Sequence, residues 1–104
     1  MLTSNEIDNL IRRIASRIQP KKIIIFGSYA KGRATIKSDL DILVIKETDL
    51  PMARRADDVR SLLSSTLIPI DVLVYTPEEV ENYAREPFSF IKSVIQTGKT
   101  VFEK

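Results

Sequence analysis

Two aspartates at the mouth of an apolar strand constrain this chain more than any other feature. Asp39 and Asp41 open the predicted strand Asp39 to Ile45, whose other residues are all aliphatic. Side chains of a strand alternate between its faces, so both carboxylates project from one face with Cα atoms about 7 Å apart. Asp is depleted in strands, and like charges this close repel each other. A bound cation would offset the repulsion, and Mg²⁺ suits carboxylate oxygens while leaving positions open for phosphate oxygens.

A Gly27-Ser28 turn ends an earlier predicted strand, Ile23 to Phe26, eleven residues before Asp39. Glycine after a strand is ordinary turn chemistry, so the dipeptide alone indicates nothing more. Its position adds weight, because backbone amides that follow a strand at the start of a helical turn point outward and bind phosphate oxygens. The Ser28 hydroxyl adds one more donor. The GxxxxGK[ST] pattern of a P-loop is absent.

A third acid, Asp71, lies within the predicted strand Ile68 to Tyr75. An unpaired carboxylate inside an apolar strand is costly, so this one needs a partner. A neighbouring strand would let it complete a metal site with Asp39 and Asp41. Two alternatives involve no ligand. Asp71 could form a salt bridge to a lysine or arginine, and Asp39 and Asp41 could lie at a solvated strand end.

The composition narrows the chemistry. The chain has no His and no Cys, so a reaction must use carboxylates, hydroxyls, Lys or Arg, backbone amides and a bound metal. Sixteen basic residues against fourteen acidic ones give a net charge of +2, too balanced to predict a nucleic-acid binder. No apolar run approaches the ~20 residues of a membrane span, and the N-terminal residues do not resemble a signal peptide. We therefore expect a cytoplasmic protein with no membrane contact.

The remaining pattern predicts helices alternating with these strands. We expect one domain over residues 1–104, with an α/β (α+β) fold in which helices pack on a small mixed β-sheet. Capping signals and apolar periodicity predict the following further elements: a helix that starts at the Thr3/Glu6 capping box and ends before Pro20, a helix from Pro51 to about Ser65, one from Thr76 to about Arg85, one from Phe88 to Thr97, and an edge strand Thr100 to Phe102.

Three segments together resemble the DNA polymerase β-like nucleotidyltransferase superfamily: residues 27–34 (Gly-Ser-Tyr-Ala-Lys-Gly-Arg-Ala), residues 38–44 (Ser-Asp-Leu-Asp-Ile-Leu-Val), and Asp71. The likeness is closest to its smallest branch, the minimal nucleotidyltransferases found as partners of HEPN-domain proteins. It extends over nearly the whole chain, and it is fairly specific because two strand ends and a turn must agree in spacing. The family often has Arg where Lys31 stands, so Lys31 keeps the charge. Arg33 departs from the acid or small residue that the family often has there; its side chain would face either the triphosphate or solvent, and solvent is favoured.

The resemblance implies a role for each site residue. Gly27 and Ser28 would hold the β and γ phosphates of a nucleoside triphosphate, with Lys31 beside them in the nucleotide-binding set. Asp39 and Asp41 would bind Mg²⁺. Asp71 would bind a second Mg²⁺ and help to activate the attacking hydroxyl, so the three acids are both catalytic and metal-binding residues.

The implied function is Mg²⁺-dependent transfer of AMP from ATP to a hydroxyl, with a tyrosine of a HEPN-type toxin as acceptor and this chain as the antitoxin. A chain without an acceptor domain takes its acceptor from another molecule or from its own dimer. Two alternatives stay open: transfer to a small hydroxylated molecule such as an aminoglycoside, and a non-catalytic antitoxin that acts by occlusion. The sequence leaves the base preference, the number of nucleotides transferred and the oligomeric state undetermined.

Overall fold

The computed structural model describes all 104 residues and contains one mixed four-stranded sheet with the strand order β3-β2-β1-β4. Strand β1 runs antiparallel to both β2 and β4, whereas β2 and β3 are parallel. The predicted fold class, a small mixed sheet with helices packed on it, is confirmed. The strands span β1 Lys22–Phe26, β2 Leu40–Ile45, β3 Ile70–Tyr75 and β4 Lys99–Glu103.

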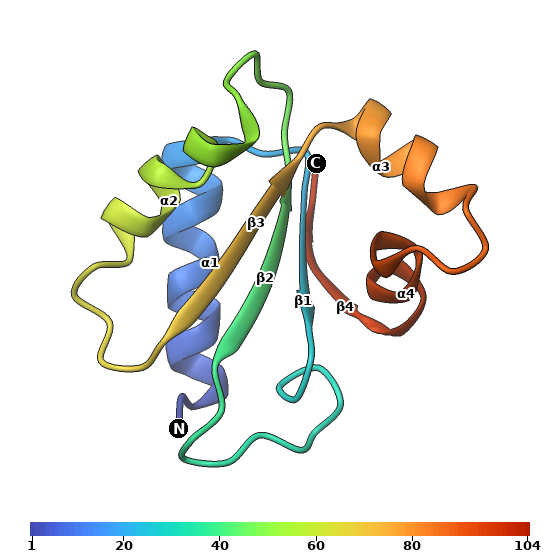
Figure 1. Ribbon diagram of the computed structural model, residues 1–104. Helices are drawn as coiled ribbons and strands as arrows, with labels where there is room; N and C mark the ends of the chain where they lie inside the picture. The colour runs from blue at the N-terminus through green and yellow to red at the C-terminus, as the bar shows by residue number, and fades with distance from the viewer.

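Helices cover both faces of this sheet: α1 and α2 lie on one side, and α3 and α4 on the other (Figure 1). None of them is long and apolar enough to cross a membrane. The helical elements are α1 Ser4–Ile18, the 3-10 turn η1 Met52–Arg54, α2 Asp57–Leu62, α3 Pro77–Ala84 and α4 Phe90–Thr97.

The two faces bury unequal cores. Thirteen buried residues lie between α1, α2 and the sheet, including Ile14, Ile42 and Val72, whereas only five lie on the α3/α4 face, including Leu43 and Ile91. Alternation along each strand produces this division, because neighbouring residues such as Ile42 and Leu43 point to opposite faces. The α1/α2 face therefore contributes most of the hydrophobic stabilisation.

Local signals set several helix ends as predicted. Thr3 and Glu6 form the expected capping box at α1, and Thr76 and Glu79 form a second at α3, where Pro77 is the first helical residue. In both boxes the threonine hydroxyl accepts from the N3 amide, while the glutamate accepts from the cap amide. These hydrogen bonds join residues three apart, so the sequence alone carries the information.

The prediction of one continuous helix from Pro51 to Ser65 is wrong, because the segment consists of η1, a turn and the short helix α2. Arg55 lies at the break, where it is the C-cap of η1. Its Nε donates to the Leu50 carbonyl at 2.8 Å and its Nη1 donates to Glu79 at 2.5 Å, so the side chain ties the turn to α3. Helical hydrogen bonding resumes at Arg60, whose amide donates to the Ala56 carbonyl. The contact between Arg55 and Glu79 joins residues 24 apart, so the apolar periodicity of residues 51–65 does not indicate it.

Candidate active site

Three residues of neighbouring strands form a row on the α3/α4 face of the sheet. Phe26, the last residue of β1, is the register partner of Asp41 in β2, and Asp41 is the register partner of Asp71 in β3. Neighbouring strands are about 4.8 Å apart, so the row places one ring and two carboxylates side by side. Leu43 and Leu73, two residues further along, belong to the α3/α4 core, which identifies the face. The sheet therefore brings Asp41 and Asp71 together although they are thirty residues apart.

Burial and neighbouring acids both disfavour the charged form of the Asp41 carboxyl. Partial burial, the nearby charge of Asp71 with its hydrogen bond, and the charge of Asp39 together raise the pKa of Asp41 to about 6. A hydrogen bond between two carboxyl groups requires a shared proton, so at neutral pH the pair is under electrostatic repulsion. No lysine or arginine relieves it, since none of the four ion pairs of the structure includes Asp41 or Asp71. A cation bound between the two carboxylates would relieve this repulsion.

The structure corrects one expectation about Asp71 and gives no support to its structural alternative. The residue was expected to be a carboxylate enclosed in an apolar strand, but it is exposed and lies one residue after the start of β3. Asp71 also forms no salt bridge to a lysine or arginine, which was the structural alternative to a metal site. The strand begins at Ile70 and not at Ile68, so Asp71 occupies the solvent-facing end of the strand. An exposed acid without a basic partner has no evident structural role there.

Asp39 lies just outside the site that the other two acids form. It is half-buried, immediately before β2, and near enough for its charge to raise the pKa of Asp41. The structure nevertheless places no three acidic side chains close enough together to hold one metal ion. The donor set still fits Mg²⁺, because the two facing carboxylates of Asp41 and Asp71 supply the hard oxygen ligands that this cation prefers.

The Gly27-Ser28 turn follows β1 directly and contacts Asp41. Gly27 has a φ of +72°, and a Cβ atom at this position would overlap the Asp41 carboxylate, so only glycine fits. Two hydrogen bonds close the turn: the Lys31 amide donates to the Gly27 carbonyl at 3.2 Å, and the Arg33 amide donates to the Ser28 carbonyl at 2.9 Å. The Ser28 amide donates to no other group of the chain and is available to a ligand. The Lys31 side chain is on the exposed part of the turn.

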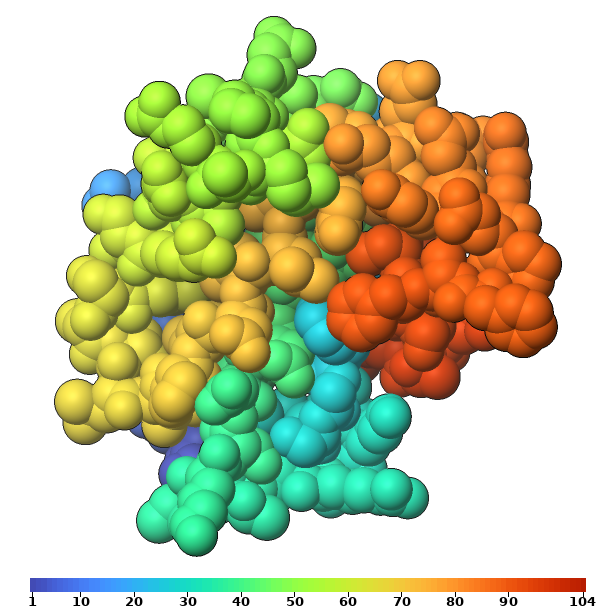
Figure 2. Space-filling model, viewed as in Figure 1, coloured from blue at the N-terminus to red at the C-terminus, as the bar shows by residue number.

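The carboxylate pair opens into a hollow of about 350 Å³ between β3, α2 and α4. Figure 2 shows the surface on this side, with the segment after β1 (cyan to turquoise) between the residues of β3 (orange) and those of α4 (red). The lining combines the two acids with one basic and four apolar side chains: Asp41, Asp71, Arg60, Phe26, Val72, Leu73 and Phe90.

Five lining residues were not among the predicted site residues: Phe26, Arg60, Val72, Leu73 and Phe90. Phe26 had a usable signal, since it precedes Gly27 and antiparallel pairing of the two predicted strands places it opposite Asp41. Arg60 is one of sixteen basic residues, and nothing in its local sequence distinguishes it from the others. Phe90 had no local signal, because only the packing of α4 on the sheet brings it to the hollow.

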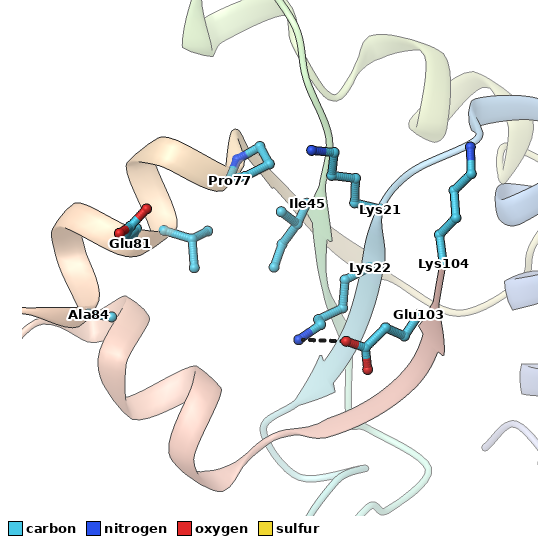
Figure 3. A pocket seen from close by; sticks show the side chains of 9 residues that line it. Lys21, Lys22, Ile45, Pro77, Glu81, Ala84, Glu103 and Lys104 are labelled. Carbon is cyan, nitrogen blue, oxygen red and sulfur yellow. Dashed lines mark ion pairs between the residues drawn. The ribbon is translucent and has the colours of Figure 1, made fainter.

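A second hollow, of about 370 Å³, lies at the opposite end of the sheet and differs in chemistry (Figure 3). Its floor is apolar, with Ile45 and Pro77 among the lining residues, and Lys21 and Lys22 lie at its side. Lys22 pairs with Glu103 at 3.5 Å, so opposite charges offset each other here. Of these two hollows, only the first contains acidic side chains that have no ion-pair partner, Asp41 and Asp71.

A family model and a relative in sequence both relate this chain to nucleotidyltransferases. The family model described as "Nucleotidyltransferase domain" matches residues 7–99. A protein of Methanocaldococcus jannaschii that bears the name "Putative protein adenylyltransferase MJ0604" is 33% identical over 84 residues, which cover 79% of this chain and 78% of the relative.

Solved structures share the fold at low sequence identity. A crystal structure of a toxin-antitoxin with AMP-PNP superposes with a TM-score of 0.65 at 24% identity, covering 93% of this chain and 73% of that one. A mutant of the toxin-antitoxin MntA-HpeT gives a TM-score of 0.63 at 24% identity, covering 100% of this chain and 75% of that one. At this identity the likeness concerns the fold alone.

Proposed function

Since this chain belongs to the nucleotidyltransferase domain family and is a nucleotidyltransferase, we propose that it transfers AMP from ATP to a hydroxyl group of a protein in a Mg²⁺-dependent reaction. The observation that carries the proposal is the uncompensated pair Asp41 and Asp71 beside the Gly27-Ser28 turn. A carboxylate pair and free backbone amides are the groups that a metal-bound triphosphate requires. The name of the M. jannaschii relative supports a protein as acceptor.

The acids Asp39, Asp41 and Asp71 would hold the metal, and we propose two Mg²⁺ ions. When bound, Mg²⁺ neutralises charge on the phosphate oxygens and lowers the pKa of a bound hydroxyl. Asp41 and Asp71 already face each other, and Asp39 is close enough to affect the ionisation of Asp41.

The chain's own groups would bind and orient the substrates. The Ser28 amide and hydroxyl, in the turn that Gly27 permits, would donate to the β and γ phosphates, and Lys31 would add a positive charge. Asp71, the exposed acid of the pair, would accept the proton of the attacking hydroxyl. The hydroxyl oxygen forms a bond to the α-phosphorus, the bond from that phosphorus to the bridging oxygen breaks, and pyrophosphate leaves.

The acceptor is, in our proposal, a tyrosine of a HEPN-type toxin, and this chain would then be the antitoxin. We also propose that residues 1–104 form one nucleotidyltransferase domain. The support is that chains of the same fold occur in structures of toxin-antitoxins, one of them with the nucleotide analogue AMP-PNP. The low identity means that this support is limited to the fold, so the partner needs a direct test.

Intact-protein mass spectrometry provides that test. The chain is incubated with the HEPN-type partner, ATP and Mg²⁺, beside an Asp39→Ala control, and the proposal expects the mass of one or more AMP units on a partner tyrosine with the wild type alone. An unmodified partner that the variant still inhibits would instead indicate occlusion. AMP on an aminoglycoside and not on the partner would indicate a small-molecule transferase.

A further inference from the structure

We infer that Phe90, supported by Phe26, forms the subsite that holds the base of the nucleoside triphosphate. The inference rests on the proposed function and adds to it the element that binds the non-phosphate end of the substrate. Neither ring was expected in the site from the sequence, and both line the hollow that contains Asp41 and Asp71.

The two rings form a defined aromatic corner. Their centroids are 5.7 Å apart and their planes meet at 79°, an edge-to-face arrangement. Phe26 is half-buried and packs against the α3/α4 core, so it is fixed in place. Phe90 remains 58% exposed despite this contact, so much of its ring surface is accessible to a ligand.

Packing of the core does not explain the position of Phe90. In the same helix Ile91 and Val94 are 3% and 2% exposed and already fill the space between α4 and the sheet. Phe90 is the first residue of α4, and it projects to the hollow instead of into that core. A large, mostly exposed ring at the rim of a site is a feature that ligand binding would account for.

The spacing suits a nucleotide. Phe26 is on the strand next to Asp41, at the strand spacing of about 4.8 Å, and the centroids of the Phe26 and Phe90 rings are 5.7 Å apart. A triphosphate at the Gly27-Ser28 turn and the acids would therefore have its ribose over Phe26 and its base against Phe90. Val72 and Leu73 add apolar surface to the same hollow.

The other side of the acids has different chemistry and is better suited to the acceptor. Beyond Asp41 lie the exposed Asp71 and the basic Arg60, without a second aromatic ring in the lining. The aromatic corner also predicts the form of base selectivity. Every base has a π-face, so stacking tolerates all four bases, and the larger rings of purines gain more contact than those of pyrimidines.

Calorimetry on three proteins tests the subsite: the wild type, Phe90→Ala and the matched control Phe88→Ala. Phe88 is 100% exposed and does not line the hollow, so it reports the effect of losing a surface ring. The probes are ATP and inorganic tripolyphosphate, each with Mg²⁺. We expect Phe90→Ala to weaken ATP binding by about 5- to 150-fold, as for loss of one stacked base, and to leave tripolyphosphate binding unchanged. Phe88→Ala should bind both like the wild type.

Each other outcome has a distinct meaning. Unchanged ATP affinity in Phe90→Ala would overturn the base subsite and leave the proposed function intact. Equal weakening of ATP and tripolyphosphate would overturn it too, since the ring would then support the phosphate site and not a base. Unchanged ATP affinity with a raised KM for the protein acceptor would assign the ring to the acceptor. A wild type that binds neither probe would contradict the proposed function itself.

Discussion

The two ends of strand β3 carry acids in opposite electrostatic settings. At its start, Asp71 faces Asp41, and burial and neighbouring acids raise the pKa of Asp41 to about 6. Just beyond its end, Glu79 accepts hydrogen bonds from Arg55 and from the Thr76 amide, which lower the pKa of Glu79. The same functional group is thus destabilised as an anion in one place and stabilised in the other.

Under the proposed function this difference separates Asp41, which serves the reaction, from Glu79, which stabilises the fold. The Glu79 carboxylate completes a capping box and joins α3 to the turn before α2, so its charge supports the fold. The Asp41 charge opposes folding because neighbouring acids repel it. A bound cation would make the contribution of this charge to stability favourable. Substitutions at the two sites should accordingly have opposite consequences for stability and activity.

The largest expected effect is on catalysis by Asp41→Asn. Under the proposed function this substitution removes one carboxylate of the metal site and should lower the rate of AMP transfer by about a thousandfold or more, because metal ligation supplies several kcal/mol of transition-state stabilisation. The melting temperature without metal should be unchanged or higher, because repulsion with Asp71 is relieved. A marked fall in melting temperature would show that Asp41 is structural.

The Gly27-Ser28 turn allows a paired test of how tightly the acid is held. Gly27 and Gly32 both have positive φ, +72° and +68°, but a Cβ at Gly32 would meet no atom within 4 Å, whereas one at Gly27 would overlap the Asp41 carboxylate. Gly32→Ala should cost only the backbone strain, about 1–2 kcal/mol of unfolding free energy. Gly27→Ala should cost more and also displace Asp41, so nucleotide binding weakens. Equal effects of the two variants in denaturant unfolding and ATP titration would refute the close contact.

At the other end of β3, Glu79→Ala should destabilise the protein without a direct effect on the reaction. Arg55, whose side chain is 12% exposed, would lose the partner that lies at 2.5 Å, and the Thr76 amide would lose its acceptor. We expect a loss of about 1–3 kcal/mol in urea unfolding. Glu81→Ala is the matched control, because its ion pair with Arg85 is about 70% exposed and is worth little. A larger loss of activity than of stability in Glu79→Ala would contradict this assignment.

The smallest expected effect is a pair of opposite pH dependences of stability without metal. The raised pKa of Asp41 means that the folded state favours the protonated acid, so its contribution falls as pH rises from about 4 to about 6. The lowered pKa of Glu79 means that its contribution is present above pH 4.5 and is lost as pH falls further. Urea unfolding of the wild type, Asp41→Asn and Glu79→Gln across this range separates the two. Identical pH profiles in all three would remove the basis of the comparison.

Local signals explain which parts of this fold were predictable. The two capping boxes and the alternation in β2 join residues within a few positions of each other, so the helix starts at Thr3 and Thr76 were predicted correctly. The face shared by Asp41 and Asp71 also followed from strand alternation, once the two strands were neighbours.

What could not be predicted depends on contacts between distant segments. At the break before α2, the Arg55 side chain donates to the distant Glu79, a contact that the local pattern does not indicate. The exposure of Asp71 depends on where β3 begins relative to β2, and the place of Phe90 depends on how α4 packs. The roles of Gly27, Ser28, Lys31 and the three acids remain predictions until ligand binding is measured.

Carbon-detected NMR titration of the Asp41 carboxyl, with and without Mg²⁺, tests most directly whether the acids form a metal site. Without metal we expect a pKa of about 6, set by burial and by Asp71 and Asp39. With Mg²⁺ and ATP the pKa should fall well below that value, because a bound cation stabilises the carboxylate. A pKa near 3.8 without metal, or one that Mg²⁺ and ATP leave unchanged, would contradict the account.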